Sequence, residues 1–217
     1  MEELTTVQKL IVWIPPVLLA ITLHEVAHGW VASLLGDPTA RLEGRLTLNP
    51  LRHVDPVGTV LVPLLTFFTA GFVFGWAKPV PVDWRRLRNP RRDMGLVAAA
   101  GPLSNLLMLA GWALLMKLAA SAGQGLIWLA LPLIYMGVAG IIINAILALI
   151  NLIPVPPLDG SRVVSALLPP PWARVYNRLE PYGLVILLVL LVSGGLDRIF
   201  GPLLGWIQDL AARFIGA

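Results

Sequence analysis

The sequence predicts an all-α polytopic membrane protein with about four to six transmembrane helices and one re-entrant or hairpin segment. Hydrophobic residues make up 57% of the 217 residues and charged residues only 13%, whereas soluble domains are about a quarter charged. Several apolar stretches reach the roughly 20 residues that a helix needs to cross a hydrocarbon core of about 30 Å. Cysteine is absent, which excludes a disulfide framework and a thiolate metal site.

The spans follow from hydropathy and from the residues that end helices, and together they form a single integral membrane domain over 1–217. The predicted core spans are 10–35, 94–118 and 126–152, with an accessory span at about 181–197. The first span ends at the GDP turn, because glycine just past a helix and proline soon after are the usual stop signals. The tail 199–217 mixes charged and apolar residues, as an amphipathic surface helix does; a weak further span would also fit.

Arginine is concentrated in three connectors, 36–56, 77–93 and 160–178, whereas the turn at 119–125 carries no charge. Because lysine and arginine favour the cytoplasmic side of a membrane, we expect all three connectors there. The apolar segment 57–76, which glycine and proline interrupt, must then enter and leave on one side as a re-entrant segment or packed hairpin. A simple crossing would also fit its length. Broken backbone at membrane depth needs protein or a water-filled cavity around it, so this segment is expected to line a cavity.

The stretch ITLHEVAHGW places three ionisable side chains inside the first span. His24 and His28 lie one turn apart on one helix face, so both rings can reach the same metal ion. Glu25 lies beside His24, where it can contact a metal-bound water without binding the metal. H-E-x-x-H is the arrangement of zinc hydrolases, with the glutamate as general base. Ionisable groups inside a span cost about 2.5–3.5 kcal/mol each, which makes two purely structural histidines the weaker interpretation.

A catalytic zinc needs a third protein ligand and an open position for water. Asp159, in NLIPVPPLDG, is the acidic residue best placed beside a long apolar stretch. The prolines of this motif end the preceding helix and impose an extended chain, and Gly160 permits a tight turn. Taken alone, Asp159 fits equally well as a helix cap worth about 1 kcal/mol. Beside HEVAH, the ligand interpretation is favoured.

HEVAH, AGPLSN and NLIPVPPLDG together resemble the motifs of the site-2 protease family of intramembrane zinc metalloproteases, in its short form without a PDZ or other soluble domain. They occur in the family's order and cover most of the chain. The resemblance implies that His24, His28 and Asp159 bind Zn²⁺ and that Glu25 is the catalytic base. It also implies that Asn151 lies near the reacting carbonyl, where its amide would stabilise the oxyanion, a role often worth roughly 10²–10³ in rate.

The same resemblance implies that the helices carrying HEVAH and LDG run in the same direction with one helix between them, so 57–76 makes an even number of crossings. It implies a hydrolase of the cell membrane whose site lies toward the cytoplasmic side. Its substrate would be a transmembrane protein or a signal-peptide remnant in the lipid bilayer, cleaved in regulated intramembrane proteolysis. No nucleic-acid partner is expected, since arginine clusters beside spans reflect membrane orientation. The alternatives are a membrane metal transporter and a non-catalytic membrane-protein binder.

Four further features are secondary candidates. His53, just before the predicted re-entrant segment, is an accessory candidate for the metal site, although loop histidines are more often solvated. Asn105, in AGPLSN, would by default hydrogen-bond between helices, and the resemblance makes it a scaffold for the site. The extended pattern KPVPVD at 78–83 would add a strand to an unwound substrate, with a plain surface hairpin as the alternative. The alternation around 40–48 fits a short strand.

Overall fold

A computed structural model describes residues 4–70, 75–122 and 124–215. Within these residues, four helical segments are long and apolar enough to cross a membrane. They are α1 (Thr6–Leu34), α4 (Pro90–Ala120), α5 (Ile127–Asn151) and the stretch Pro170–Val192, which is made of α7 (Pro170–Tyr176), η5 (Asn177–Tyr182) and α8 (Gly183–Val192). The prediction of an all-α polytopic membrane protein is confirmed.

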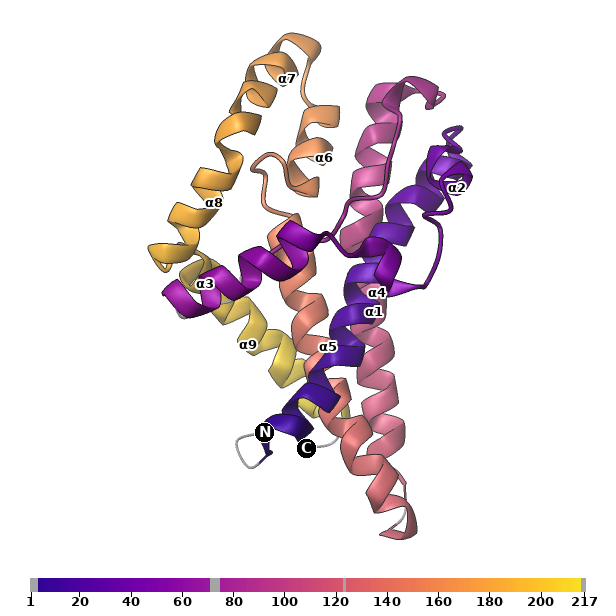
Figure 1. Ribbon diagram of the computed structural model, residues 1–217, viewed down its shortest axis with the longest axis vertical. Helices are drawn as coiled ribbons and strands as arrows, with labels where there is room; N and C mark the ends of the chain where they lie inside the picture. Colours follow the sequence, from indigo (N-terminus) through magenta and orange to yellow (C-terminus); the bar gives the residue numbers. More distant parts are fainter. Residues whose placement is uncertain (1–3, 71–74, 123, 216–217) are drawn as a thin grey trace.

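Helices α1, α4 and α5 pack together as the core of the molecule (Figure 1). α1 and α5 run in the same direction, and α4, the long helix between them in sequence, runs the opposite way. The carbonyl of Leu35, at the end of α1, accepts a hydrogen bond of 3.1 Å from the backbone N–H of Arg88, just before α4. The intervening chain therefore leaves and returns at the same end of the bundle, in agreement with the even number of crossings expected from the sequence.

Small residues let these three helices approach closely. Ala20 on α1 and Ala139 and Ala148 on α5 are fully buried, and Gly140 lies so close to Trp112 that a Cβ there would be 2.4 Å from the indole. Large apolar side chains instead point outward along the same helices. In a bilayer, lipid is as apolar as leucine, so close van der Waals packing of small residues holds helices together. The bundle has the composition of a membrane-embedded core.

The connector from α1 to α4 begins with a helical turn where the sequence predicts a strand. It contains α2 (Thr39–Leu42), η1 (Pro50–His53), η2 (Pro56–Leu61), α3 (Val62–Ala70) and η3 (Trp84–Arg86). The prediction of a strand around 40–48 is wrong. The fully buried carboxylate of Asp37 accepts hydrogen bonds from the backbone N–H and hydroxyl of Thr39, and this local bond starts a helical turn that the alternation of side chains does not reveal.

Within the predicted re-entrant segment, the helix formed by η2 and α3 is too short to cross a membrane by itself. At the α-helical rise of about 1.5 Å per residue, η2 and α3 together rise at most about 22 Å, which is less than the roughly 30 Å of a hydrocarbon core. It lies across the core helices rather than along them (Figure 1). The backbone N–H of Trp76 donates to Gly58 O over 3.0 Å, so the chain comes back to where the helix began. These contacts favour a hairpin over a simple crossing; residues 71–74 lie outside the described part.

A short 3₁₀ helix, η4 (Gln124–Leu126), joins α4 to α5, and helices α6 (Asp159–Leu167) and α9 (Gly195–Ile215) complete the described fold. The accessory helix, predicted to run to about 197, ends at Val192, and Gly194 turns the chain with a left-handed φ of 70°. α9 contains the amphipathic sequence of the tail and packs one face on the core, with Ala211 buried against Ala113 and Met116. Residues 216–217 of the predicted tail lie outside the described part.

Candidate metal centre

Three side chains predicted as metal ligands converge at one point. His24 and His28 project from α1, and Asp159 is the first residue of α6. The two Nε2 atoms are 3.1 Å apart, and Asp159 Oδ2 lies 3.2 Å from His24 Nε2 and 3.3 Å from His28 Nε2. In the described part of the chain, no other set of three histidine, cysteine or acidic residues brings its ligand atoms within 4.8 Å of one another.

The spacing of these atoms fits a zinc ion. Ligand atoms about 2.0–2.2 Å from a tetrahedral zinc are about 3.3–3.6 Å from each other, close to the distances found. His24 Nδ1 lies 2.6 Å from Asn105 Oδ1, and His28 Nδ1 lies 2.7 Å from the Val97 carbonyl oxygen. Because both partners are acceptors, each Nδ1 carries the ring proton, and each Nε2 presents a lone pair toward Asp159 Oδ2. Three lone-pair donors that converge in this way form a ligand set for one cation.

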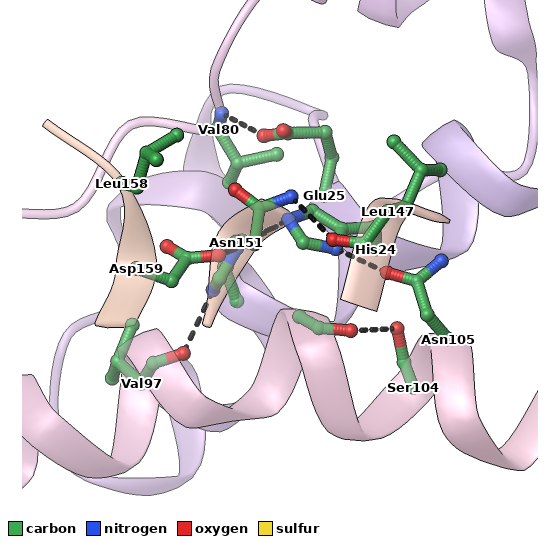
Figure 2. A network of polar contacts seen from close by, with 12 residues as sticks. His24, Glu25, Val80, Val97, Ser104, Asn105, Leu147, Asn151, Leu158 and Asp159 are labelled. Atoms are coloured by element: carbon green, nitrogen blue, oxygen red, sulfur yellow. Dashed lines mark hydrogen bonds and ion pairs between the residues drawn. The ribbon is translucent and has the colours of Figure 1, made fainter. Parts of the chain in front are cut away.

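Asn105 fixes the orientation of the His24 ring from the fully buried interior of α4. Its Nδ2 donates to Asn144 Oδ1 over 2.9 Å and to Ala20 O over 3.3 Å. Its Oδ1 is left to accept from His24, the contact drawn in Figure 2. Asn144, on α5, donates its own Nδ2 to Gly140 O. The amides thus link α1, α4 and α5 and set the histidine tautomer. Such supporting partners typically change metal affinity 10–100-fold when removed.

Asp159 does not cap α6, so the capping role considered from the sequence is not seen. The N-cap residue is Leu158, which makes no side-chain cap bond, and Asp159 Oδ2 is buried and accepts no well-formed hydrogen bond. A zinc ligand must be an ionised carboxylate, and a buried oxygen with no hydrogen-bond donor is available to bind the ion.

Close packing of α6 against the end of α5 sets the position of Asp159. A Cβ at Gly160 would lie 2.3 Å from Leu152 O, so only glycine lets α6 begin this near to α5. On the other side, the Tyr176 hydroxyl donates to Pro154 O over 2.7 Å and holds the proline-rich stretch against α7. Gly160 is thus a helical residue and not part of the tight turn predicted there, and glycine is required by space, since its neighbours are backbone atoms that cannot move aside.

Gly101, on α4, is a site residue that sequence reasoning did not single out. A Cβ at this position would lie 2.4 Å from His28 Nε2 and 2.5 Å from His24 Cε1. The absence of a side chain here is what lets both rings reach Asp159. Its only signal in the sequence is a small residue inside AGPLSN, and small residues are common in membrane helices. Asn144 was also missed, because a buried asparagine carries no ligand spacing.

Gly101→Ala should therefore push the histidine rings apart and lower both zinc content and activity. The matched control is Gly111→Ala, on the same helix, where an added Cβ meets nothing within 4 Å. That change should leave zinc unchanged and stabilise the helix by up to about 1 kcal/mol. Zinc per chain after dialysis, with thermal unfolding of both variants, measures the effect. Equal zinc content in the two variants would show that the rings do not need this space.

Glu25 is half-buried and points toward the connector, not toward Asp159 (Figure 2). Its Oε2 accepts a hydrogen bond of 2.8 Å from the backbone N–H of Val80. Asn151, the last residue of α5, lies beside the metal centre (Figure 2), and its Nδ2 donates to Leu147 O over 3.0 Å. Both groups lie near the three converging side chains without being among them.

His53 does not join the converging side chains. It is buried, and its Nε2 lies 3.0 Å from Thr47 O, while its backbone carbonyl accepts from Lys78 N–H over 2.9 Å. In the structure, His53 therefore helps to hold the extended segment 78–83 beside the site.

Comparisons with known proteins agree with this chemistry. The family model described as "Peptidase family M50" matches residues 128–193. "Putative zinc metalloprotease YwhC" of Bacillus subtilis is 38% identical over 201 residues, which is 92% of this chain and 89% of that protein.

Two proteins named "Putative zinc metalloprotease Rip2" are also similar. The one from Mycolicibacterium smegmatis is 29% identical over 196 residues and the one from Mycobacterium tuberculosis H37Rv 32% over 195, each alignment covering 89% of this chain and 71% of the relative. No solved structure matches. With its membrane-length helices and its zinc metalloprotease relatives, the chain belongs to peptidase family M50, the site-2 proteases, and is a membrane zinc metalloprotease.

Proposed function

We propose that this metalloprotease is an intramembrane endopeptidase that cleaves transmembrane segments of membrane proteins, with His24, His28 and Asp159 as its zinc ligands. The depth of the converging side chains carries the proposal. His24 stands ten residues before Leu34, the end of α1, or about 15 Å along the helix axis. If α1 crosses a hydrocarbon core of about 30 Å, the ligands lie within it. A substrate peptide bond that reaches these ligands therefore lies in a part of the substrate that is embedded in the membrane.

The residues around the ligands have the roles that hydrolysis requires. Bound zinc supplies Lewis-acid polarisation of the scissile carbonyl and of water. Glu25 takes a proton from the attacking water and gives it to the leaving amide nitrogen. Asn151 donates its side-chain N–H to the developing oxyanion after turning away from Leu147 O, a bond within its own helix that is readily exchanged.

The substrate has to unwind before it can be cut. In an intact helix every backbone N–H and carbonyl is paired within the helix, which shields the peptide bond. Transmembrane proteins and signal-peptide remnants whose helices unwind locally are therefore the expected substrate class. The extended segment 78–83, which contacts Glu25 through Val80, is expected to lie along the unwound chain.

The active site is expected to face the cytoplasmic side. The three arginine-rich connectors gather at the end of the bundle where α1 ends and α4 begins (Figure 1). The positive-inside rule assigns that end to the cytoplasm. His24 is nearer to this end of α1 than to its start at Thr6, so water and released products have the shorter route on that side.

The two other functions considered from the sequence lack a supporting observation. A metal transporter needs ligands in succession along a path, whereas the described residues contain one compact cluster. A non-catalytic binder has no use for a carboxylate beside the metal ligands, and Glu25 is present. The relatives, moreover, are named as metalloproteases.

A direct test uses the purified protein with a panel of single-pass transmembrane peptides and signal-peptide remnants in detergent micelles. Mass spectrometry should locate cuts inside the apolar stretch of at least one peptide. A zinc chelator should stop cleavage, and added zinc should restore it, because hydrolysis depends on the ion. In parallel, liposomes with the protein should show no zinc flux. Cuts confined to soluble flanks, or zinc flux without cleavage, would contradict the proposal.

A further inference from the structure

The carboxylate of Glu25 is not free in this structure. Its Oε2 accepts the Val80 N–H over 2.8 Å, and Figure 2 shows the side chain turned toward that backbone. The group expected to take a proton from water is therefore held by a different donor before any substrate arrives.

The sequence around Val80 makes this donor unusual. In KPVPVD, Pro79 and Pro81 have no backbone N–H, so Val80 carries the single donor of three consecutive residues. Successive residues of an extended chain point their N–H groups to opposite edges. The neighbouring donor on the same edge, Lys78 N–H, is already bonded to His53 O over 2.9 Å. Between Lys78 and Pro81, an unwound substrate can therefore receive a backbone hydrogen bond only from Val80.

The backbone at Val80 is held in place more firmly than the Glu25 side chain. The buried guanidinium of Arg45 donates from Nη2 to Lys78 O over 2.9 Å and to Pro79 O over 3.3 Å. The Val80 side chain is buried so close to α1 that a Cβ at Gly29 would lie 2.7 Å from it. Glu25 can rotate about its side-chain bonds, whereas the Val80 N–H cannot turn away. When another acceptor takes this N–H, Glu25 is the partner that leaves.

We propose that the Val80 N–H holds Glu25 in a resting position and is also the point at which the substrate backbone binds. A carbonyl of the unwound substrate takes this hydrogen bond and releases Glu25 to the metal centre. A helical substrate cannot do so, because its carbonyls are bonded within the helix. The base therefore becomes available only when an unwound chain is in place. This inference rests on the proposed function, in which Glu25 is the base.

Binding measurements on inactive variants test the competition without relying on turnover. The probe is a fluorescent transmembrane peptide that the wild type cleaves, and its Kd is measured for zinc-loaded Glu25→Gln and Glu25→Ala in the same micelles. The glutamine still competes for the Val80 N–H through its amide oxygen, whereas alanine does not. Glu25→Ala should bind the peptide about 2–10-fold more tightly, the range that a single net hydrogen bond provides. Equal Kd values would overturn the proposal.

A second pair of variants isolates the N–H itself. Val80→Pro removes the donor, and Val80→Ala keeps it while shortening the same side chain. In the Glu25→Ala background, Val80→Pro should weaken binding about 2–10-fold beyond Val80→Ala, and in the Glu25→Gln background by less. Equal weakening by the two substitutions would also overturn the proposal. If Val80→Pro does not fold, the comparison of the two Glu25 variants still decides.

The outcome for this inference is separable from that for the proposed function. If the wild type cuts no transmembrane peptide, the proposed function fails first. If the wild type cuts within the membrane while Glu25→Gln and Glu25→Ala bind the peptide equally, only the resting contact fails.

A disulfide assay tests independently whether the substrate lies along segment 78–83, and it is possible because the chain has no cysteine of its own. Lys78→Cys, at an exposed position, should cross-link to a cysteine placed beside the cleavage point of the peptide.

Discussion

Replacing Glu25 with glutamine should abolish cleavage of transmembrane peptides and leave zinc binding intact. The amide has the size of the carboxylate and does not touch the converging atoms of His24, His28 and Asp159, so the ligand set is unchanged. It cannot take a proton from water, and loss of general-base catalysis lowers a rate by about 10²–10⁴. The rate of peptide cleavage and the zinc content per chain, measured on the same preparation, check both parts.

The matched control is Glu43→Gln, because Glu43 is exposed and lies in the connector between α1 and α4. That change removes the same charge without contacting the site and should leave the rate within about twofold, as most surface substitutions do. Cleavage that survives Glu25→Gln would sink the mechanism proposed above. Loss of zinc together with activity would instead indicate that Glu25 supports the metal centre and is not its base.

Asp159→Asn should release the metal. The substitution removes the anionic ligand, and its NH₂ group would donate to the Nε2 lone pairs of His24 and His28 that the ion needs. Zinc affinity should fall by more than the 10–100-fold that follows loss of a supporting hydrogen bond, and cleavage should fall with it. Zinc retained per chain against a competing chelator is the measurement.

Asp209→Asn is the control, since Asp209 is exposed on α9 and the change is chemically identical. It should retain zinc and activity. Thermal unfolding of both variants separates loss of metal from loss of fold. One zinc per chain in Asp159→Asn, at the affinity of the wild type, would show that the third ligand is another residue.

The fold class and the two-histidine motif could be predicted because they depend on local properties of the chain. Helix length and hydropathy define spans, and helical periodicity alone puts His24 and His28 on one face. The prediction at 40–48 failed for a related reason. Alternation of side chains is a local pattern, and the buried Asp37 carboxylate overrides it by bonding to Thr39.

The remaining site residues depend on contacts between distant segments. The Val97 carbonyl and Gly101 have no side-chain chemistry, yet one holds the His28 ring and the other leaves it space. Asp159 was predictable only by combining its motif with HEVAH, because by itself it fits a cap equally well. The contact between Glu25 and Val80 spans 55 positions and depends on where the connector folds back, which no local pattern encodes.

The sequence by itself determined that this chain spans the membrane several times and carries a zinc-hydrolase motif, because hydropathy and helical spacing are written residue by residue. The tertiary structure decided which atoms meet. Close packing of α1, α4 and α5 over small residues turns both Nε2 atoms toward Asp159, and the returning connector takes the Glu25 carboxylate. These outcomes follow from the space left between helices, and that space exists only when all three are packed together.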